Sequence, residues 1–225
     1  MQFLKDLSHP ISPENPYEFI DGWLYHNGKR VPYVPAHDHS GTMQKLKGCV
    51  MHYGAGTFDS DTRMLTGDDH IYVSATLVLA RTGAVRQLTN LFTVAWHCGD
   101  GEFEPAKPYG GRTPNYCFAG IEMENLGWLN QQGQAGYAGR KGGVVWPISD
   151  TIRAIHPIRG GPAMWWPKYP AVQVQHADWI VEAMKDASKD FEFLVGHDEM
   201  SRYKYDPGPA YDMDRMRATL NLKGS

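Results

Sequence analysis

Short apolar runs separated by turn residues dominate the first half of the chain. Four of them have the length of buried strands: residues 48–53, 71–80, 84–96 and 116–124. Such near-continuous hydrophobic runs are typical of strands that are covered on both faces of a sheet. Arg-Thr-Gly at 81–83 predicts a turn between the second and third runs.

The second half contains one clear helical pattern, over residues 171–190. Its apolar side chains fall on one face of a helix: Trp179, Ile180, Ala183, Met184 and Ala187. Residues 191–195 predict a further strand, and residues 212–222 predict a terminal helix whose first turn is favoured by its aspartates. This succession predicts an α/β fold with a central mixed β-sheet flanked by helices.

Two segments depart from that pattern. Residues 1–45 are rich in Pro, His and Tyr, and an Asn-Gly pair between the apolar runs at 23–34 predicts a hairpin turn. Residues 127–170 are rich in Gly, Gln, Trp and Pro, which predicts a long irregular insertion of functional or mobile character. We therefore expect an N-terminal arm or hairpin at 1–45 and one main domain at 46–225 that carries the insertion.

Composition narrows the class of protein. The 225 residues suit a single domain with decorations, and 42% hydrophobic residues allow a substantial core. A net charge of −3 argues against nucleic-acid binding, which needs a basic face. We also expect no membrane insertion, because no stretch approaches the roughly 18–20 apolar residues of a membrane span.

Cysteine content and the N-terminal sequence indicate the compartment in which the protein is synthesised. Three cysteines, Cys49, Cys98 and Cys117, argue against a disulfide framework. The N-terminus lacks the basic and apolar regions of a secretory signal, so we expect synthesis in a reducing cytoplasm. We expect a monomer.

Three polar residues stand out as candidate metal ligands. His52 ends one predicted strand, His197 ends another, and the nine residues to Asp206 allow the chain to turn back beside His197. Two imidazoles and one carboxylate are a common catalytic zinc set, with a fourth position open for water. The residues alone leave this open, because a histidine that ends an apolar run is more often a packed side chain.

Two further histidines, His37 and His39, would share one side of an extended segment and could bind a second metal. A solvated arm is the alternative, and the one we favour.

Four blocks between about residues 46 and 217 carry a family resemblance. They are the strand that ends in His52, residues 73–88, the pair AWHCG and GIEMEN at 95–99 and 120–125, and GHDEMSRYKYDPGP at 196–209. In this order the blocks resemble the zinc-dependent N-acetylmuramoyl-L-alanine amidases of the type-2 amidase family. That family includes phage lysozyme-like amidases, anhydro-muropeptide amidases and peptidoglycan recognition proteins. The sequence departs from the family's pattern at Thr82 and Cys98.

The resemblance implies a set of site residues. It makes His52, His197 and Asp206 the ligands of one zinc ion. Glu122 falls on the catalytic glutamate of the anhydro-muropeptide branch, and Lys204 falls on its catalytic lysine.

The general base has two alternatives. The phage and recognition-protein branch uses a tyrosine at the position that is Ala75 here, so we expect Glu122 to act as the general base. Glu124 is the rival, and we expect only one of the two carboxylates to point at the metal. We prefer Glu122 because it matches the motif.

Other polar and aromatic residues have two interpretations. Trp96, His97 and Asn115 are candidates for substrate binding, although Trp96 and His97 could equally form the cleft wall or the core. The tryptophans of the insertion could stack on sugars or form a local core, and we favour the local core: Trp128, Trp146, Trp165 and Trp166. His176 is expected to be structural, and Asp198, Glu199 and Arg202 are expected to be loop surface.

The resemblance implies hydrolysis of the amide between N-acetylmuramic acid and the L-alanine of peptidoglycan. The expected partner is peptidoglycan or a muropeptide. We favour a phage or prophage endolysin that reaches the cell wall through a holin-type pore. The alternatives are a cytosolic enzyme that recycles anhydro-muropeptides and a peptidoglycan-binding protein without catalysis.

Overall fold

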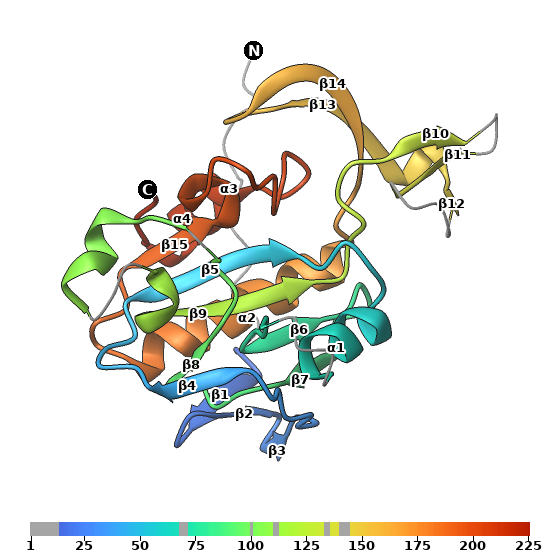
Figure 1. Ribbon diagram of the computed structural model, residues 1–225. Helices are drawn as coiled ribbons and strands as arrows, with labels where there is room; N and C mark the ends of the chain where they lie inside the picture. Colours follow the sequence, from blue (N-terminus) through green and yellow to red (C-terminus); the bar gives the residue numbers. More distant parts are fainter. Residues whose placement is uncertain (1–13, 68–71, 100, 110–112, 133–135, 140–144) are drawn as a thin grey trace, which may run out of the picture.

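A five-stranded mixed β-sheet lies at the centre of the molecule (Figure 1). This computed structural model describes residues 14–67, 72–99, 101–109, 113–132, 136–139 and 145–225. The strands follow the order β15 (Phe193–Gly196), β5 (Gly48–Tyr53), β9 (Phe118–Met123), β6 (Leu77–Leu79) and β7 (Val85–Gln87). The first four are parallel and β7 is antiparallel to β6, which confirms the predicted mixed sheet.

Side-chain alternation divides the sheet into two faces. Odd-numbered residues of β5 and β9, such as Met51 and Ile121, pack in the main core. The helices α2 (Ala171–Ala187) and α4 (Met213–Leu220) contribute to that same core. Even-numbered residues point the other way, so this alternation decides which strand residues can reach a site on the second face.

The second face is covered by short elements. Val50 and Phe118 pack there with residues of η1 (Glu104–Tyr109) and α3 (His197–Met200), and η2 (Pro114–Tyr116) lies beside them. A third cluster lies beneath α1 (Phe58–Thr66), a helix that the hydrophobic pattern did not predict. A capping box between Thr57 and Ser60 begins α1.

The N-terminal strands confirm the predicted hairpin. β2 (Trp23–His26) pairs with β3 (Lys29–Arg30), and both turn residues have positive φ, 51° at Asn27 and 71° at Gly28. β1 (Tyr17–Ile20) pairs with β2 and lies against α2, where the Tyr17 hydroxyl is 2.7 Å from Nδ1 of His176. His176 is therefore a structural residue, as expected.

Two of the predicted strands are shorter than the apolar runs. The run at 84–96 divides into β7 and β8 (Thr93–Ala95), because a turn closed by Thr93 N–H and Asn90 C=O bends the chain. β8 pairs with β4 (His39–Thr42) in a separate two-stranded sheet. The run at 71–80 contains only the three residues of β6, and its first residue lies outside the described part.

The insertion is not irregular, which corrects the sequence-based expectation. It contains a three-stranded sheet of β10 (Asn130–Gln132), β11 (Gly136–Ala138) and β12 (Val145–Trp146), followed by η3 (Ile148–Asp150). A long hairpin of β13 (Thr151–His156) and β14 (Gly160–Pro167) then arches over the body of the molecule (Figure 1). Composition misled here because the glycines at 160 and 161, with φ of 64° and 84°, begin β14 directly after the hairpin turn.

Among the described residues, no helix is both long enough and apolar enough to span a membrane.

Candidate functional site

The sheet register brings three of the candidate residues together. His52 lies next to Glu122 in the pairing of β5 with β9, and both side chains leave the sheet on its second face. β15 pairs Gly196 with Met51, so His197, the next residue, emerges beside His52. A local sequence pattern cannot show this, because it arises from the pairing of three distant strands.

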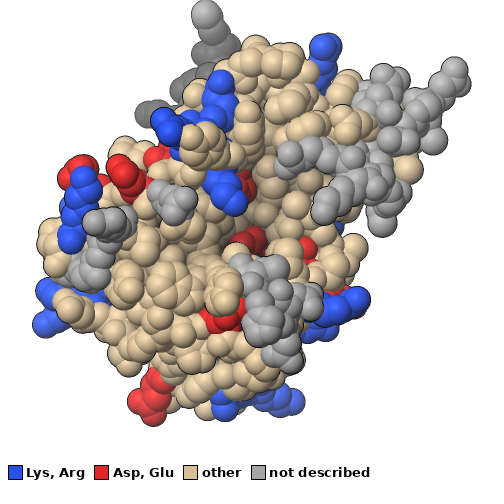
Figure 2. All heavy atoms as spheres, viewed as in Figure 1, with Lys and Arg blue, Asp and Glu red and all other residues tan. Residues whose placement is uncertain are grey.

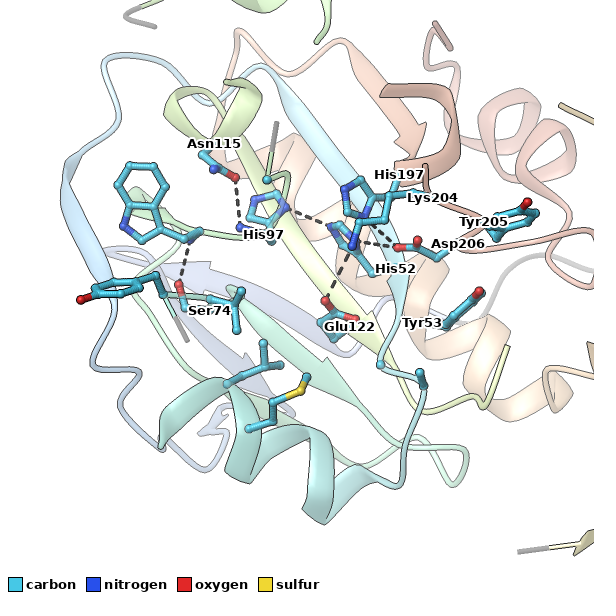
Figure 3. Close-up of a pocket in the computed structure, with 18 of the residues that line it drawn as sticks. His52, Tyr53, Ser74, His97, Asn115, Glu122, His197, Lys204, Tyr205 and Asp206 are labelled. Carbon is cyan, nitrogen blue, oxygen red and sulfur yellow. Dashed lines mark hydrogen bonds and ion pairs between the residues drawn. The ribbon is translucent and has the colours of Figure 1, made fainter. Parts of the chain in front are cut away.

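The ring nitrogens of His52 and His197 converge with the carboxylate of Asp206 (Figure 3). His52 Nδ1 lies 2.9 Å from His197 Nδ1 and 2.9 Å from Asp206 Oδ2, and the third side of this triangle measures 3.0 Å. All three side chains are buried. Among the residues that the structure describes, they form the one group of three such side chains that could hold a metal ion. His37 and His39 belong to no such group.

Hydrogen-bond partners assign the tautomers of these rings. His97 Nε2 lies 3.1 Å from the Phe118 carbonyl, which can only accept, so Nε2 carries the proton and Nδ1 is an acceptor. His52 Nε2 lies 3.0 Å from that Nδ1 and therefore donates to it. The opposite nitrogen of His52, Nδ1, is left with a lone pair.

His197 obeys the same rule. Its Nε2 lies 3.3 Å from the Cys98 carbonyl and donates to it, which leaves a lone pair on Nδ1. Two imidazole lone pairs and a carboxylate oxygen thus face one another at hydrogen-bond distance. A metal cation at the centre of this triangle would satisfy all three acceptors.

The donor set fits zinc. Zinc in catalytic sites takes three protein ligands from this group of residue types and keeps one position open. Donor atoms on a tetrahedral zinc ion lie about 3.3 Å apart when zinc–nitrogen bonds are 2.0–2.1 Å long. The triangle therefore needs to open by only a few tenths of an ångström.

Protonation states agree with cation binding. The pKa of His52 is lowered to about 4, chiefly by burial and secondarily by the nearby His197, although Asp206 acts in the opposite direction. Burial by itself would raise the pKa of Asp206, but its contacts with His197 and His52 outweigh that effect and lower it. A neutral imidazole and an ionised carboxylate are the forms that bind metals.

Glu122 is the carboxylate that points at this triangle. Its Oε1 lies 4.0 Å from His52 Nδ1, and its Oε2 is buried without a hydrogen-bond partner among the described residues. Burial raises the pKa of Glu122 well above its ordinary value, and the carboxylates of Asp206 and Asp61 raise it further. Such a carboxyl group is suited to proton transfer.

Glu124 is not a second base in this arrangement. β9 ends at Met123, and the Glu124 carboxylate accepts a hydrogen bond of 2.9 Å from the backbone N–H of Arg81. Strand alternation alone would not separate the two glutamates, because residues two apart share a face. The two glutamates differ because Glu122 lies within β9, whereas Glu124 lies beyond its last residue, Met123.

A cavity of about 570 Å³ opens in front of the triangle, and Lys204 lines it together with Glu122, Tyr53, Tyr203 and Tyr205. Figure 2 shows the molecule hollowed near its centre, with acidic atoms inside and basic atoms at the rim. The positive charge of Lys204 lowers the pKa of Glu122, which places the two groups within electrostatic reach.

The three candidate substrate-binding residues, Trp96, His97 and Asn115, also line this cavity. Both ring nitrogens of His97 already contact protein atoms. The side-chain oxygen of Asn115 accepts from the backbone N–H groups of His97 and Cys98, at 3.1 and 2.9 Å. His97 and Asn115 therefore hold the wall of the cavity in place, whatever they bind.

Two residues expected to be loop surface have structural partners instead. Asp198 is buried, and its carboxylate lies 3.2 Å from His156 Nε2. Glu199 accepts from the N–H of Gly196 at 2.6 Å and forms an ion pair with Arg217. The expectation was wrong because both partners come from segments distant in sequence.

The insertion's tryptophans favour the local-core interpretation. Trp166 is fully buried beside His156, and the guanidinium of Arg81 covers the ring of Trp146 at 4.1 Å. Arg81 thereby attaches the base of the insertion to the turn that follows β6.

Comparison with known proteins identifies relatives of this arrangement. The profile of a family described as N-acetylmuramoyl-L-alanine amidase matches residues 42–209. Comparison with curated proteins yields no significant match.

Several solved structures share the fold. A structure of an AmpD derivative is 20% identical, with a TM-score of 0.60, and the match covers 89% of this chain and 98% of that one. AmiD from E. coli, in complex with anhydro-N-acetylmuramic acid-L-Ala-D-gamma-Glu-L-Lys, is 20% identical with a TM-score of 0.56, over 94% of this chain and 68% of that one. AmpDh3 from Pseudomonas aeruginosa, in complex with an anhydromuramic pentapeptide, is 17% identical with a TM-score of 0.54, over 79% and 60%.

Proposed function

The chain belongs to the N-acetylmuramoyl-L-alanine amidase family. From this premise we propose that it hydrolyses the amide bond between N-acetylmuramic acid and L-alanine with one zinc ion held by His52, His197 and Asp206. Family membership gives the amidase activity on peptidoglycan. The zinc ion, the residue roles and the biological setting are the proposed part.

The observation that carries the zinc proposal is the triangle of acceptors. Its two imidazole lone pairs and one carboxylate oxygen lie 2.9–3.0 Å apart in a buried site. A bound zinc ion would supply a Lewis acid that lowers the pKa of water to about 7 and polarises a carbonyl group.

Glu122 is proposed as the general base and acid. Its raised pKa and its position 4.0 Å from His52 suit a group that takes a proton from the attacking water. The same carboxyl group then returns that proton to the departing amine of L-alanine. Its buried Oε2 has no hydrogen-bond donor among the described residues to stabilise the ionised form, which suits a carboxyl group that holds the proton between these two steps.

Lys204 is proposed to stabilise the negative charge that develops on the carbonyl oxygen. It lines the cavity two residues before Asp206, so its ammonium group can approach the reacting carbonyl from the side of the ligand loop. Trp96, His97 and Asn115 are proposed to form the wall against which the substrate lies.

We propose an endolysin-type cell-wall lytic enzyme as the setting. Recycling of soluble anhydro-muropeptides is the second candidate, and one observation favours it: AmiD and AmpDh3, whose folds this chain shares, are in complex with anhydro-muropeptides. We further propose that residues 1–45, of which 1–13 lie outside the described part, form an arm on the amidase domain of residues 46–225, since β1–β3 lie outside the central sheet.

Product analysis tests the proposal. Intact sacculi and soluble anhydro-muropeptides are digested separately, with and without a zinc chelator, and the products are identified by mass. Free stem peptide that disappears with chelator is the expected result, and the preferred substrate separates the two settings. Cleavage between sugars, or full activity after chelation and zinc removal, would contradict it.

A further inference from the structure

The turn of the β13–β14 hairpin lies against the loop that carries Lys204 and Asp206 (Figure 1). This loop leaves β15 through α3 and returns at Asp206, where the N–H of Asp198 donates to the Asp206 carbonyl at 2.8 Å. Two further backbone bonds lie within the loop, from Ser201 N–H to the His197 carbonyl at 3.0 Å and from Lys204 N–H to the Ser201 carbonyl at 3.1 Å. The insertion adds contacts at the carbonyl groups on both sides of these bonds.

Arg159, in the hairpin turn, binds three carbonyl groups of this loop. Its Nε donates to the carbonyl of Lys204 at 2.9 Å, and Nη2 donates to the carbonyls of Ser201, at 2.5 Å, and Asp198. A planar guanidinium fixes such acceptors relative to one another, which a flexible ammonium cannot do. One side chain thus joins the start, middle and end of the loop.

His156, at the end of β13, adds a second restraint. Its Nδ1 accepts from the backbone N–H groups of Ile158 and Arg159, at 3.3 and 3.1 Å, so the ring proton lies on Nε2. That proton faces the Asp198 carboxylate at 3.2 Å and the Tyr205 carbonyl at 3.1 Å. The hairpin turn therefore orients His156, and His156 contacts the residue between Lys204 and Asp206.

We infer that Arg159 and His156 are positioning residues, and that the insertion sets the rate of amide hydrolysis by holding Lys204 in place. This inference rests on the function proposed for Lys204. It assigns the insertion a part in catalysis that does not require contact with the substrate. Displacement of a catalytic group by about 1 Å can lower a rate roughly a hundredfold.

The test compares Arg159→Ala with Arg153→Ala. Arg153 is an exposed arginine of β13, so its removal makes the same charge change on the same hairpin without a contact to the loop. With a soluble anhydro-muropeptide, Arg159→Ala should lower kcat roughly ten- to hundredfold, with KM and the unfolding midpoint nearly unchanged. Hydrogen exchange of the amides at 198–206 should become faster in Arg159→Ala alone. If Arg159→Ala does not fold, Arg159→Lys replaces it. We then expect a smaller decrease in kcat and a smaller increase in the rate of hydrogen exchange.

Lys204→Ala separates this inference from the proposed function. If Arg159 acts through Lys204, Arg159→Ala should lower kcat little further in the Lys204→Ala background. Equal losses in both backgrounds, or Arg159→Ala behaving like Arg153→Ala, would overturn the inference. Full activity of Lys204→Ala would instead remove the function proposed for Lys204, while hydrogen exchange still reports whether Arg159 holds the loop.

Discussion

His52 Nε2 lies 3.0 Å from Nδ1 of His97, on the side of the imidazole ring opposite the candidate metal ligands. His97 in turn donates to the carbonyl of Phe118, within β9. This chain of donors fixes the tautomer of His52 and aims its Nδ1 at the proposed metal position. Partners of this kind orient metal ligands in many proteins.

Replacing His97 should therefore weaken metal binding. His97→Ala removes the acceptor for His52 Nε2, and we expect zinc affinity to fall roughly ten- to hundredfold. His97→Gln offers an amide oxygen to the same N–H and should retain more affinity. Competition with a chromophoric chelator measures both. Equal zinc affinity in wild type and His97→Ala would show that the contact does not orient His52.

Glu122 and Glu124 provide a matched pair for the general base. Glu122→Gln should lower kcat roughly a hundred- to ten-thousandfold while one zinc ion stays bound, because the amide cannot accept the proton. Glu124→Gln changes the same charge two residues away, where the side chain only accepts from Arg81 N–H. It should keep most of the activity. A similar loss in both variants would argue against Glu122 as the base.

The ends of strands were the most predictable part of the site. His52 lies near the end of an apolar run whose strand boundaries, Gly48–Tyr53, match the run itself. Asp206 and Lys204 became interpretable only through resemblance to a family, since no local pattern relates them to His52. The register of β15, β5 and β9, which brings His197 and Glu122 to His52, depends on partners that are 70 residues apart between β5 and β9 and 145 residues apart between β5 and β15.

Contacts of the insertion could not be read from the sequence. Gly, Pro and Trp in this segment indicated irregular chain, yet cross-strand pairs such as Ile152 with Trp166 build a regular hairpin. His156 and Arg159 gave no signal at all. Their partners are backbone carbonyls of a distant loop, and any residue type supplies a carbonyl.

Zinc should bind with a stoichiometry of one and stabilise the fold. At a free concentration about 100 times the dissociation constant, a ligand specific to the folded state adds about 2.7 kcal/mol to the free energy of unfolding. Thermal unfolding of the metal-free protein with added zinc measures this. His197→Ala should abolish the stabilisation, whereas His39→Ala, at an exposed position in β4, should not. If wild type binds a second ion and His39→Ala does not, that result would support the alternative metal site in the arm.

Asp61 should make the protein less stable as pH rises from about 4 to about 7. Its side chain lies against Gly54 and Gly56, and Oδ2 is buried without a hydrogen-bond partner among the described residues. Burial, and secondarily the charge of Glu124, raises the pKa of Asp61 from 3.8 to about 7. Between these values the folded state holds a proton that the unfolded state has released, so the free energy of unfolding falls with increasing pH.

Asp61→Asn is neutral at every pH and should remove this part of the pH dependence. Each pKa unit corresponds to about 1.4 kcal/mol, and relaxation around the ionised group reduces the sum, so we expect a gain of about 1–3 kcal/mol at pH 8 relative to wild type. At pH 4 the two proteins should have nearly equal stability. Asp59→Asn is the control, since that side chain is 71% exposed on the same helix. Urea unfolding at both pH values tests this prediction. An equal change in the free energy of unfolding between pH 4 and pH 8 in wild type and Asp61→Asn would mean that Asp61 ionises freely in the folded protein.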